Sequence, residues 1–232
     1  MTGASDQTER RSFLSRLGLG AAVLGAGLGA GLVAVKPAAA QTSAFKPRRH
    51  NDDAWMDAPK GGHRVVIDSA SPGAGGAALL YANNSFAANK SGYGLETDDI
   101  AVIVVLRHLS TPFAYTDAIW AKYGAAFSEI LDFKDPNTKA APVTNLYNSG
   151  GAGMSNMGVT IPSLVAKKVR FAVCGSATRF MSNAVAQRTK GEAEAIYQEF
   201  VANLIPNSHL VSAGVVAVNR AQEYGYTLLT AV

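Results

Sequence analysis

The single cysteine of this chain, Cys174, is the residue best placed to do chemistry. It ends a short apolar run, residues 170–173, of the kind that forms a buried strand. Gly175 follows it, and then a segment with helical periodicity, so the thiol should lie at a helix N-terminus. The partial positive charge at such a terminus stabilises a thiolate, which would serve as a nucleophile or a sulfur acceptor. The alternative is a buried cysteine that behaves as a small hydrophobic residue.

Other polar residues follow predicted strands and should lie near this thiol. Arg107 and His108 come directly after the apolar run 100–106, and ligands of open parallel sheets bind beyond the carboxyl ends of the strands. A histidine beside a thiol can act as its base or ion-pair partner, or it can simply bond the backbone. We therefore expect Cys174 and His108 to carry the chemistry, in a pocket formed by Arg107, Gly175, Ser176, Thr178, Asp117 and Trp120.

Two further patterns suggest ligands less specifically. The stretch 69–76 is rich in glycine but lacks the Lys-Ser/Thr ending of nucleotide loops, so we interpret it as a tight strand-to-helix connection. Met154, Met157 and Met181, with His108 and Cys174, form a soft-ligand set that would suit copper(I) or haem. No paired His-x-His or Cys-x-x-Cys accompanies it, and we expect no cofactor and no metal.

The elements that must position these residues alternate along the chain. Apolar runs predict strands at 64–68, 100–106, 170–173, 209–211 and 226–229. Helical patterns lie between them, at 77–89, within 111–131, and at 161–168, 177–188, 192–204 and 214–224. This order favours one α/β domain over residues 63–232, a three-layer α/β/α sandwich with a mainly parallel five-stranded sheet.

Details within this domain lead to further expectations. In the helix at 177–188, periodicity places Phe180, Met181, Ala184 and Val185 on one face. Residues 132–158 form an inserted loop long enough to remodel the pocket. Residues 41–62 are an extended linker or arm in which only Trp55 and Met56 have a reason to dock.

The N-terminus has the pattern of an export signal. Arg10 and Arg11 precede an apolar run, 17–35, and a small-residue end at 38–40, which predicts cleavage after Ala40. The paired arginines with Ser-Phe-Leu resemble the twin-arginine (Tat) motif, although Glu9 stands where Ser or Thr is preferred. A transmembrane anchor is the alternative, but six of the 19 apolar-run residues are glycine. We expect a periplasmic protein that the Tat translocase exports.

Composition excludes several classes of protein. Of 232 residues, 48% are hydrophobic and 16% charged, which excludes a disordered chain. One cysteine excludes an intrachain disulfide framework. Residues 1–40 hold four of the 21 basic and two of the 17 acidic residues, so the remaining chain carries a net charge of +2. The sequence has no lysine-rich run, so we do not expect nucleic acid as a partner.

Two segments of the domain resemble a known family. Residues 169–175, Val-Arg-Phe-Ala-Val-Cys-Gly, are similar to the cysteine strand of the DsrE/DsrF-like family of sulfur-handling proteins. Residues 210–216 and 221–227 resemble that family's closing motif, and the likeness spans 63–232. The resemblance implies a homotrimer or hexamer, and a persulfide on Cys174 in sulfur relay. The relay members known best are cytoplasmic, whereas this chain has an export signal.

These observations together predict an exported protein that handles reduced sulfur through Cys174. A carrier is favoured over a turnover enzyme, because no convincing general acid/base set accompanies the nucleophile. A periplasmic binding module for a soft metal, haem or small ligand is the alternative, and a purely structural oligomer is a third possibility. Apolar surface on Val215, Val218 and Tyr224 predicts that the last helix and strand contact another copy of the chain. The sulfur donor and acceptor stay open.

Overall fold

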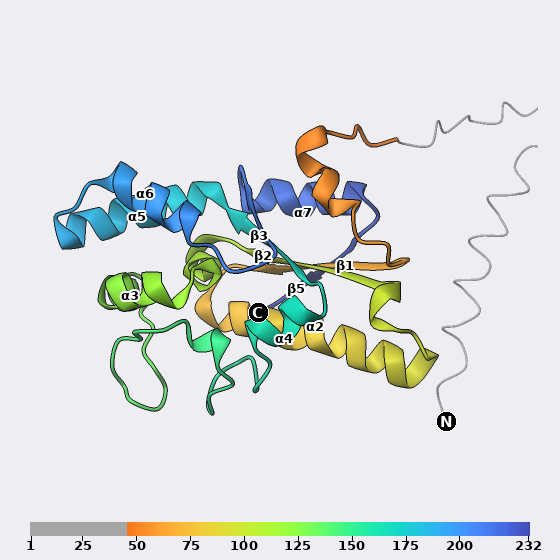
Figure 1. Ribbon diagram of the computed structural model, residues 1–232, viewed down its shortest axis with the longest axis horizontal. Helices are drawn as coiled ribbons and strands as arrows, with labels where there is room; N and C mark the ends of the chain where they lie inside the picture. The colour runs from red at the N-terminus through yellow and green to blue at the C-terminus, as the bar shows by residue number, and fades with distance from the viewer. Residues whose placement is uncertain (1–45) are drawn as a thin grey trace, which may run out of the picture. The chain divides into compact units, whose positions relative to one another are not determined.

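A five-stranded parallel sheet organises residues 46–232, the part of the chain that the computed structural model describes (Figure 1). The strands are β1 (His63–Ser69), β2 (Ile100–Leu106), β3 (Arg170–Cys174), β4 (Ser208–Val211) and β5 (Thr227–Thr230). Their order is β4-β3-β2-β1-β5, and all four pairings are parallel. The prediction of an α/β fold with a parallel five-stranded sheet is confirmed.

Helices cover both faces of the sheet. They are α2 (Pro72–Tyr93), α3 (Asp117–Leu131), α4 (Ile161–Ala166), α5 (Gly175–Thr189), α6 (Ala193–Ala202) and α7 (Gly214–Glu223). Short 3-10 helices are η1 (Asn51–Met56), η2 (Thr97–Asp99), η3 (His108–Ala114) and η4 (Leu146–Asn148). Helices α2 and α4 lie below the sheet in Figure 1 and α7 lies above it, whereas α3, α5 and α6 pack together at one end. No helix of residues 46–232 is both long enough and apolar enough to span a membrane.

The central strands of the sheet are buried on both faces, which explains why they are continuous apolar runs. Every residue of β2 is buried. Val102, Val104 and Leu106 join the larger core with α2 and α3, and the residues between them join a smaller core under α7. Alternate side chains of one strand therefore hold together the two halves of the domain.

Helix α2 begins earlier than the sequence predicts. The stretch 72–76 was expected to be a turn, yet the helix starts at Pro72, where Ser71 caps it by accepting the Ala74 N–H at 3.1 Å. The glycines serve packing here. A Cβ on Gly76 would come within 2.6 Å of the Tyr147 hydroxyl and 2.2 Å of Ser155 Oγ. The inserted loop approaches α2 closely because this position lacks a side chain.

The segment that precedes β1, which includes η1, packs against the rest of the domain. Trp55 stacks on the His209 ring with centroids 4.3 Å apart, and Met56 is fully buried in the core under α7. Both predicted docking residues therefore do dock. The Tyr224 hydroxyl donates to the His50 carbonyl at 3.2 Å, so the chain's own arm covers this tyrosine. The apolar surface expected on Tyr224 is therefore buried within the chain, and its contact with another copy stays an untested prediction. The predicted export signal, 1–40, and residues 41–45 lie outside the described residues.

Candidate functional site

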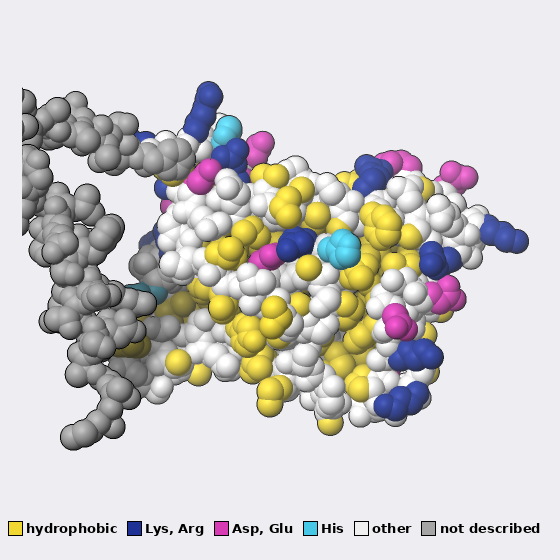
Figure 2. Space-filling view, turned by 180° about the vertical axis from the view of Figure 1, so that it is seen from behind, with side chains coloured by type: hydrophobic (Ala, Val, Ile, Leu, Met, Phe, Trp, Pro, Cys, Tyr) yellow, Lys and Arg dark blue, Asp and Glu magenta, His cyan; other side chains and the backbone are white. Residues whose placement is uncertain are grey.

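Strand register brings the predicted chemical residues to one edge of the sheet. Leu106 at the end of β2 pairs with Val173 of β3, so the residues that follow them, Arg107 and Cys174, are neighbours. Arg107, His108, Cys174 and Ser176 line one cavity of about 450 Å³, together with Ala177, Phe180, Ala213, Gly214 and Val215. On the face drawn in Figure 2, charged side chains and a histidine lie side by side with apolar side chains around them.

Cys174 caps helix α5 with its sulfur. Its Sγ accepts a hydrogen bond from the Ala177 N–H at 3.3 Å, as predicted from its place before a helix. The residue is only 6% exposed, yet it belongs to neither core cluster of residues 46–232 and borders the cavity. Gly175 lets the helix begin here, because a Cβ on it would lie 2.8 Å from the Val211 carbonyl oxygen. The thiol therefore lies at a helix N-terminus beside open space.

A buried hydrogen-bond chain holds the cysteine backbone from below. Thr178 Oγ1 donates to the Cys174 carbonyl at 2.9 Å and accepts from the Tyr115 hydroxyl at 3.2 Å. Burial raises the pKa of Tyr115 far above its ordinary value, so this hydroxyl stays a neutral donor. Thr178, predicted as a pocket residue, is fully buried and supports the cavity wall without lining it.

Arg107 is held by a carboxylate from the neighbouring strand. Its Nε and Nη2 donate to the two oxygens of Asp68, each at 2.8 Å, in a bidentate pair. The hydrogen bond to Asp68 is the main cause that raises the pKa of Arg107; partial burial opposes it, and the charges of Asp68 and Cys174 add to the rise. The pair holds the guanidinium of Arg107 in place beside the thiol, and the carboxylate of Asp68 balances its positive charge.

His108 lines the same cavity from a strained backbone position. Its φ of 53° lies in the left-handed region, and its Nδ1 is 3.3 Å from the Ala70 carbonyl oxygen. A carbonyl only accepts hydrogen bonds, so this contact places the proton of a neutral ring on Nδ1 and leaves Nε2 as an acceptor. The backbone contact matches one predicted alternative, and the role of the other nitrogen as a base for Cys174 stays a prediction.

Two predicted pocket residues lie elsewhere. Asp117 is exposed at the start of α3, where its Oδ1 accepts from the Asn145 N–H and the Asn148 side-chain amide, both at 2.8 Å. Trp120 is fully buried among aromatic rings, and its Nε1 donates to the Pro112 carbonyl at 2.9 Å. Neither lines the cavity. The 3-10 helix η3 separates them from the strand end, so nearness in sequence was misleading.

The inserted loop and the methionines also stay away from the thiol. Residues 132–158 provide none of the residues that line the cavity, contrary to the expected remodelling. They pack on the other side of the domain, where the Tyr147 hydroxyl donates to the Pro72 carbonyl at 2.6 Å. Met154 and Met181 are buried in the larger core and Met157 is exposed. The soft-ligand set is therefore not assembled, and no cluster of three or more His, Cys, Asp or Glu suited to a metal occurs within residues 46–232.

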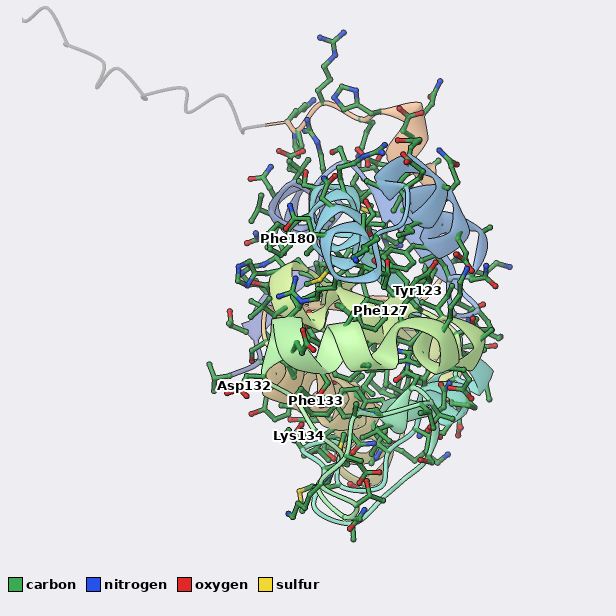
Figure 3. The ribbon with its side chains drawn as sticks, turned by 90° about the vertical axis from the view of Figure 1, so that its left-hand side faces the viewer. Tyr123, Phe127, Asp132, Phe133, Lys134 and Phe180 are labelled. Atoms are coloured by element: carbon green, nitrogen blue, oxygen red, sulfur yellow. The ribbon has the colours of Figure 1, made fainter. Side chains whose placement is uncertain are left out.

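Several residues near the thiol were not predicted as part of the site. Asp68 was recognised only as the end of a strand, Gly214 only as a helix start, and Phe180 was expected on a buried face. Phe180 is instead 56% exposed, and Figure 3 shows it on the outer side of α5, away from Tyr123 and Phe127. The buried face of α5 is one residue out of phase with that expectation, since it includes Thr178, Met181, Ser182 and Val185. The polar Thr178 and Ser182 masked the period.

Comparison with known proteins adds little to this geometry. No family model and no curated protein matches the chain. This chain is similar to the solved structure of a protein of unknown function, MTH1491 from Methanobacterium thermoautotrophicum. The match covers 72% of this chain and 98% of that protein. The two are 14% identical, with a TM-score of 0.36. A likeness at this level carries no argument about function.

Proposed function

We propose that this protein carries sulfane sulfur as a persulfide on Cys174. The observation that supports this most is the cysteine sulfur that caps α5 while bordering a cavity. Its Sγ accepts the Ala177 N–H at 3.3 Å at the N-terminus of α5, the kind of position in which reactive cysteines are found. The resemblance of residues 169–175 to the DsrE/DsrF-like cysteine strand points the same way.

The surroundings of the thiol favour a carrier over an enzyme that turns over. Cys174 is the only cysteine of the chain, so no second thiol can resolve a persulfide into a disulfide within one chain. Among the residues that line the cavity, His108 is the only one besides Cys174 whose side chain can accept a proton readily, because the guanidinium of Arg107 stays protonated. One nucleophile and one base can accept and release a sulfur atom, but they supply no separate acid for a leaving group.

Sulfur loading tests the proposal directly. After incubation with inorganic polysulfide, the intact mass of the purified full chain should rise by about 32 Da, one sulfur atom, and Cys174→Ser should not change. The substitution should cost about 1 kcal/mol, so loss of loading would not reflect loss of fold. Circular dichroism of both proteins provides that control.

Alkylation distinguishes a reactive thiol from a core thiol. A small reagent such as iodoacetamide should label the native protein quickly at Cys174, and a bulky maleimide more slowly, because the residue is only 6% exposed. If Cys174 resists both reagents until the protein is denatured, it is a packing residue and the carrier proposal is wrong.

We further propose that the protein is exported to the periplasm by the Tat pathway. The support is the sequence of residues 1–40, with its paired arginines, apolar run and small-residue end. Changing Arg10 and Arg11 together to lysine should leave uncleaved precursor in the cytoplasm, as cell fractionation and N-terminal sequencing would show. Normal export and cleavage of that variant would contradict the assignment.

A further inference from the structure

The cavity beside Cys174 has apolar walls that no element of the described chain covers. Phe180 from α5 is 56% exposed and Val215 from α7 is 61% exposed, and both line the cavity with Ala177 and Ala213. In Figure 2, apolar side chains surround the charged ones on this face. A volume of about 450 Å³ suits a small ligand. Large apolar side chains that stay exposed beside a thiol mark a contact surface for something apolar.

Several polar groups of the walls already have partners within the chain. Two guanidinium N–H groups of Arg107 are engaged by Asp68 at 2.8 Å, so the pair adds no net charge. Ser176 Oγ donates to the Ser212 carbonyl at 3.0 Å, and the Ala177 N–H is used by Cys174 Sγ. His108 Nε2 and the N–H groups of Arg107 that Asp68 does not engage are left for the sulfur end of a ligand.

From these contacts, and resting on the carrier function proposed above, we infer that the sulfur donor is a small organic hydropersulfide with an apolar body. Its alkyl or aryl group would contact Phe180 and Val215, and its sulfur end would meet Cys174. A donor such as glutathione persulfide fits less well, because its polar peptide body would lie against the apolar walls formed by Phe180 and Val215.

The transfer balances without an external oxidant or reductant. The Cys174 thiol gives its proton to His108 Nε2, and the resulting thiolate attacks the terminal sulfur of R–S–SH. The S–S bond of the donor breaks and its electron pair leaves on R–S⁻, which takes the proton from His108. The products are Cys174–S–SH and R–SH, so the sulfane sulfur changes its partner and the total oxidation state is unchanged.

Competing donors test this inference on the purified full chain. Loading of one sulfur atom is followed by intact mass with benzyl hydropersulfide and with glutathione persulfide. Each rate is divided by the rate of the same donor with N-acetylcysteine, which removes intrinsic reactivity. We expect the wild type to prefer the benzyl donor by about tenfold or more, the scale of discrimination that an apolar pocket provides.

Two variants show whether the cavity is the cause. Phe180→Ala should lose most of the preference, because it removes the largest apolar wall. Tyr93→Ala is the matched control, since Tyr93 is 80% exposed at the end of α2 and does not line the cavity, and it should keep the full preference. Iodoacetamide labelling of Cys174 should be similar in both variants.

The outcomes separate this inference from the function on which it rests. Equal normalised rates for the two donors, or an unchanged preference in Phe180→Ala, would overturn the apolar donor while polysulfide loading still supported a carrier. The same holds if light scattering shows that Phe180→Ala breaks an oligomer, because the apolar surface would then be an interface. If no donor, polysulfide included, adds sulfur to Cys174, the proposed function itself falls.

Discussion

At the scale of single residues, the position of Arg107 depends on the absence of a side chain at Gly214. A Cβ added to Gly214 would lie 2.5 Å from Arg107 Cβ and 3.1 Å from its Cδ, closer than carbon atoms pack. The stem of Arg107 therefore fits against the first residue of α7, while its guanidinium reaches Asp68. Two segments that are far apart in sequence thus set the charge beside Cys174.

Replacing this glycine should disturb both stability and the thiol. We expect Gly214→Ala to lower the free energy of unfolding by about 1–3 kcal/mol, because the arginine or the start of α7 must move. It should also change the alkylation rate of Cys174. Denaturant unfolding and iodoacetamide kinetics measure the two effects.

A second glycine provides the control for that variant. Gly73 lies in the first turn of α2 with nothing within 4 Å of an added Cβ, so Gly73→Ala should keep or slightly raise the stability. Wild-type stability and wild-type alkylation in Gly214→Ala would show that the contact is unimportant.

The Asp68–Arg107 pair shows what sequence alone cannot reveal about the site. The two residues are 39 positions apart, and only the β1–β2 register brings them together. Cys174 and His108 were identifiable because each follows an apolar run, a local signal. The carboxylate partner, the exposed Phe180 and the role of Gly214 depend on packing between separate elements, which no local pattern encodes.

At the scale of elements, the arm before β1 is joined to β4 through a histidine that must be neutral. Trp55 of η1 stacks on His209 with an interplanar angle of 8°, and Arg170 Nη1 lies 3.2 Å from His209 Nε2. A guanidinium only donates, so the Nε2 atom in this contact carries no proton. Burial first, and then the charge of Arg170, lowers the pKa of His209 below its ordinary 6.5.

This contact predicts a loss of stability in mild acid. A histidine with a lowered folded pKa contributes stability above its unfolded pKa, and that contribution is lost as the pH falls below 6.5 and through the lowered value. Denaturant unfolding from about pH 7 to about pH 5 should show the decrease. Glu194, Glu199 and Glu223 have pKa values below 4.5, so they titrate outside this window.

A substitution isolates the histidine. In His209→Gln the side-chain oxygen can still accept from Arg170 but does not titrate, so the decrease between these pH values should become smaller. An identical pH profile in wild type and variant would remove His209 as its cause.

The elements themselves were largely predictable, for a physical reason. Strands buried on both faces are continuous apolar runs, and β2 matches its predicted bounds, 100–106. The start of α2 was missed because residues 72–76 are mostly glycine and alanine, and glycine is typical of turns. The local signals for a helix start, Ser71 as the cap and Pro72 in the first turn, were outweighed by these glycines.

At the scale of the whole molecule, strand β5 leaves an apolar edge uncovered. All four of its residues are exposed, including Leu228 and Leu229. Leu228 pairs with Val66, whose side chain lies in the core under α7, and Leu229 pairs with Ile67 of the larger core. Neighbouring residues of a strand face opposite sides, so the sheet is uncovered on both faces at this edge. An exposed edge strand with leucines on both faces is a surface that other chains cover.

We therefore expect an oligomer that β5 joins. Val215 lines the cavity, and its predicted contact with another copy stays untested. Light scattering at micromolar concentration should give the mass of more than one chain for the wild type. Changing Leu228 and Leu229 together to lysine should reduce it to one chain, because two charges on an edge strand oppose pairing with another copy. Tyr93→Lys, at an exposed position on the far end of α2, should leave the mass unchanged. A wild type that is monomeric at this concentration would contradict the prediction, and sulfur loading of Cys174 would then have to be explained within a single chain.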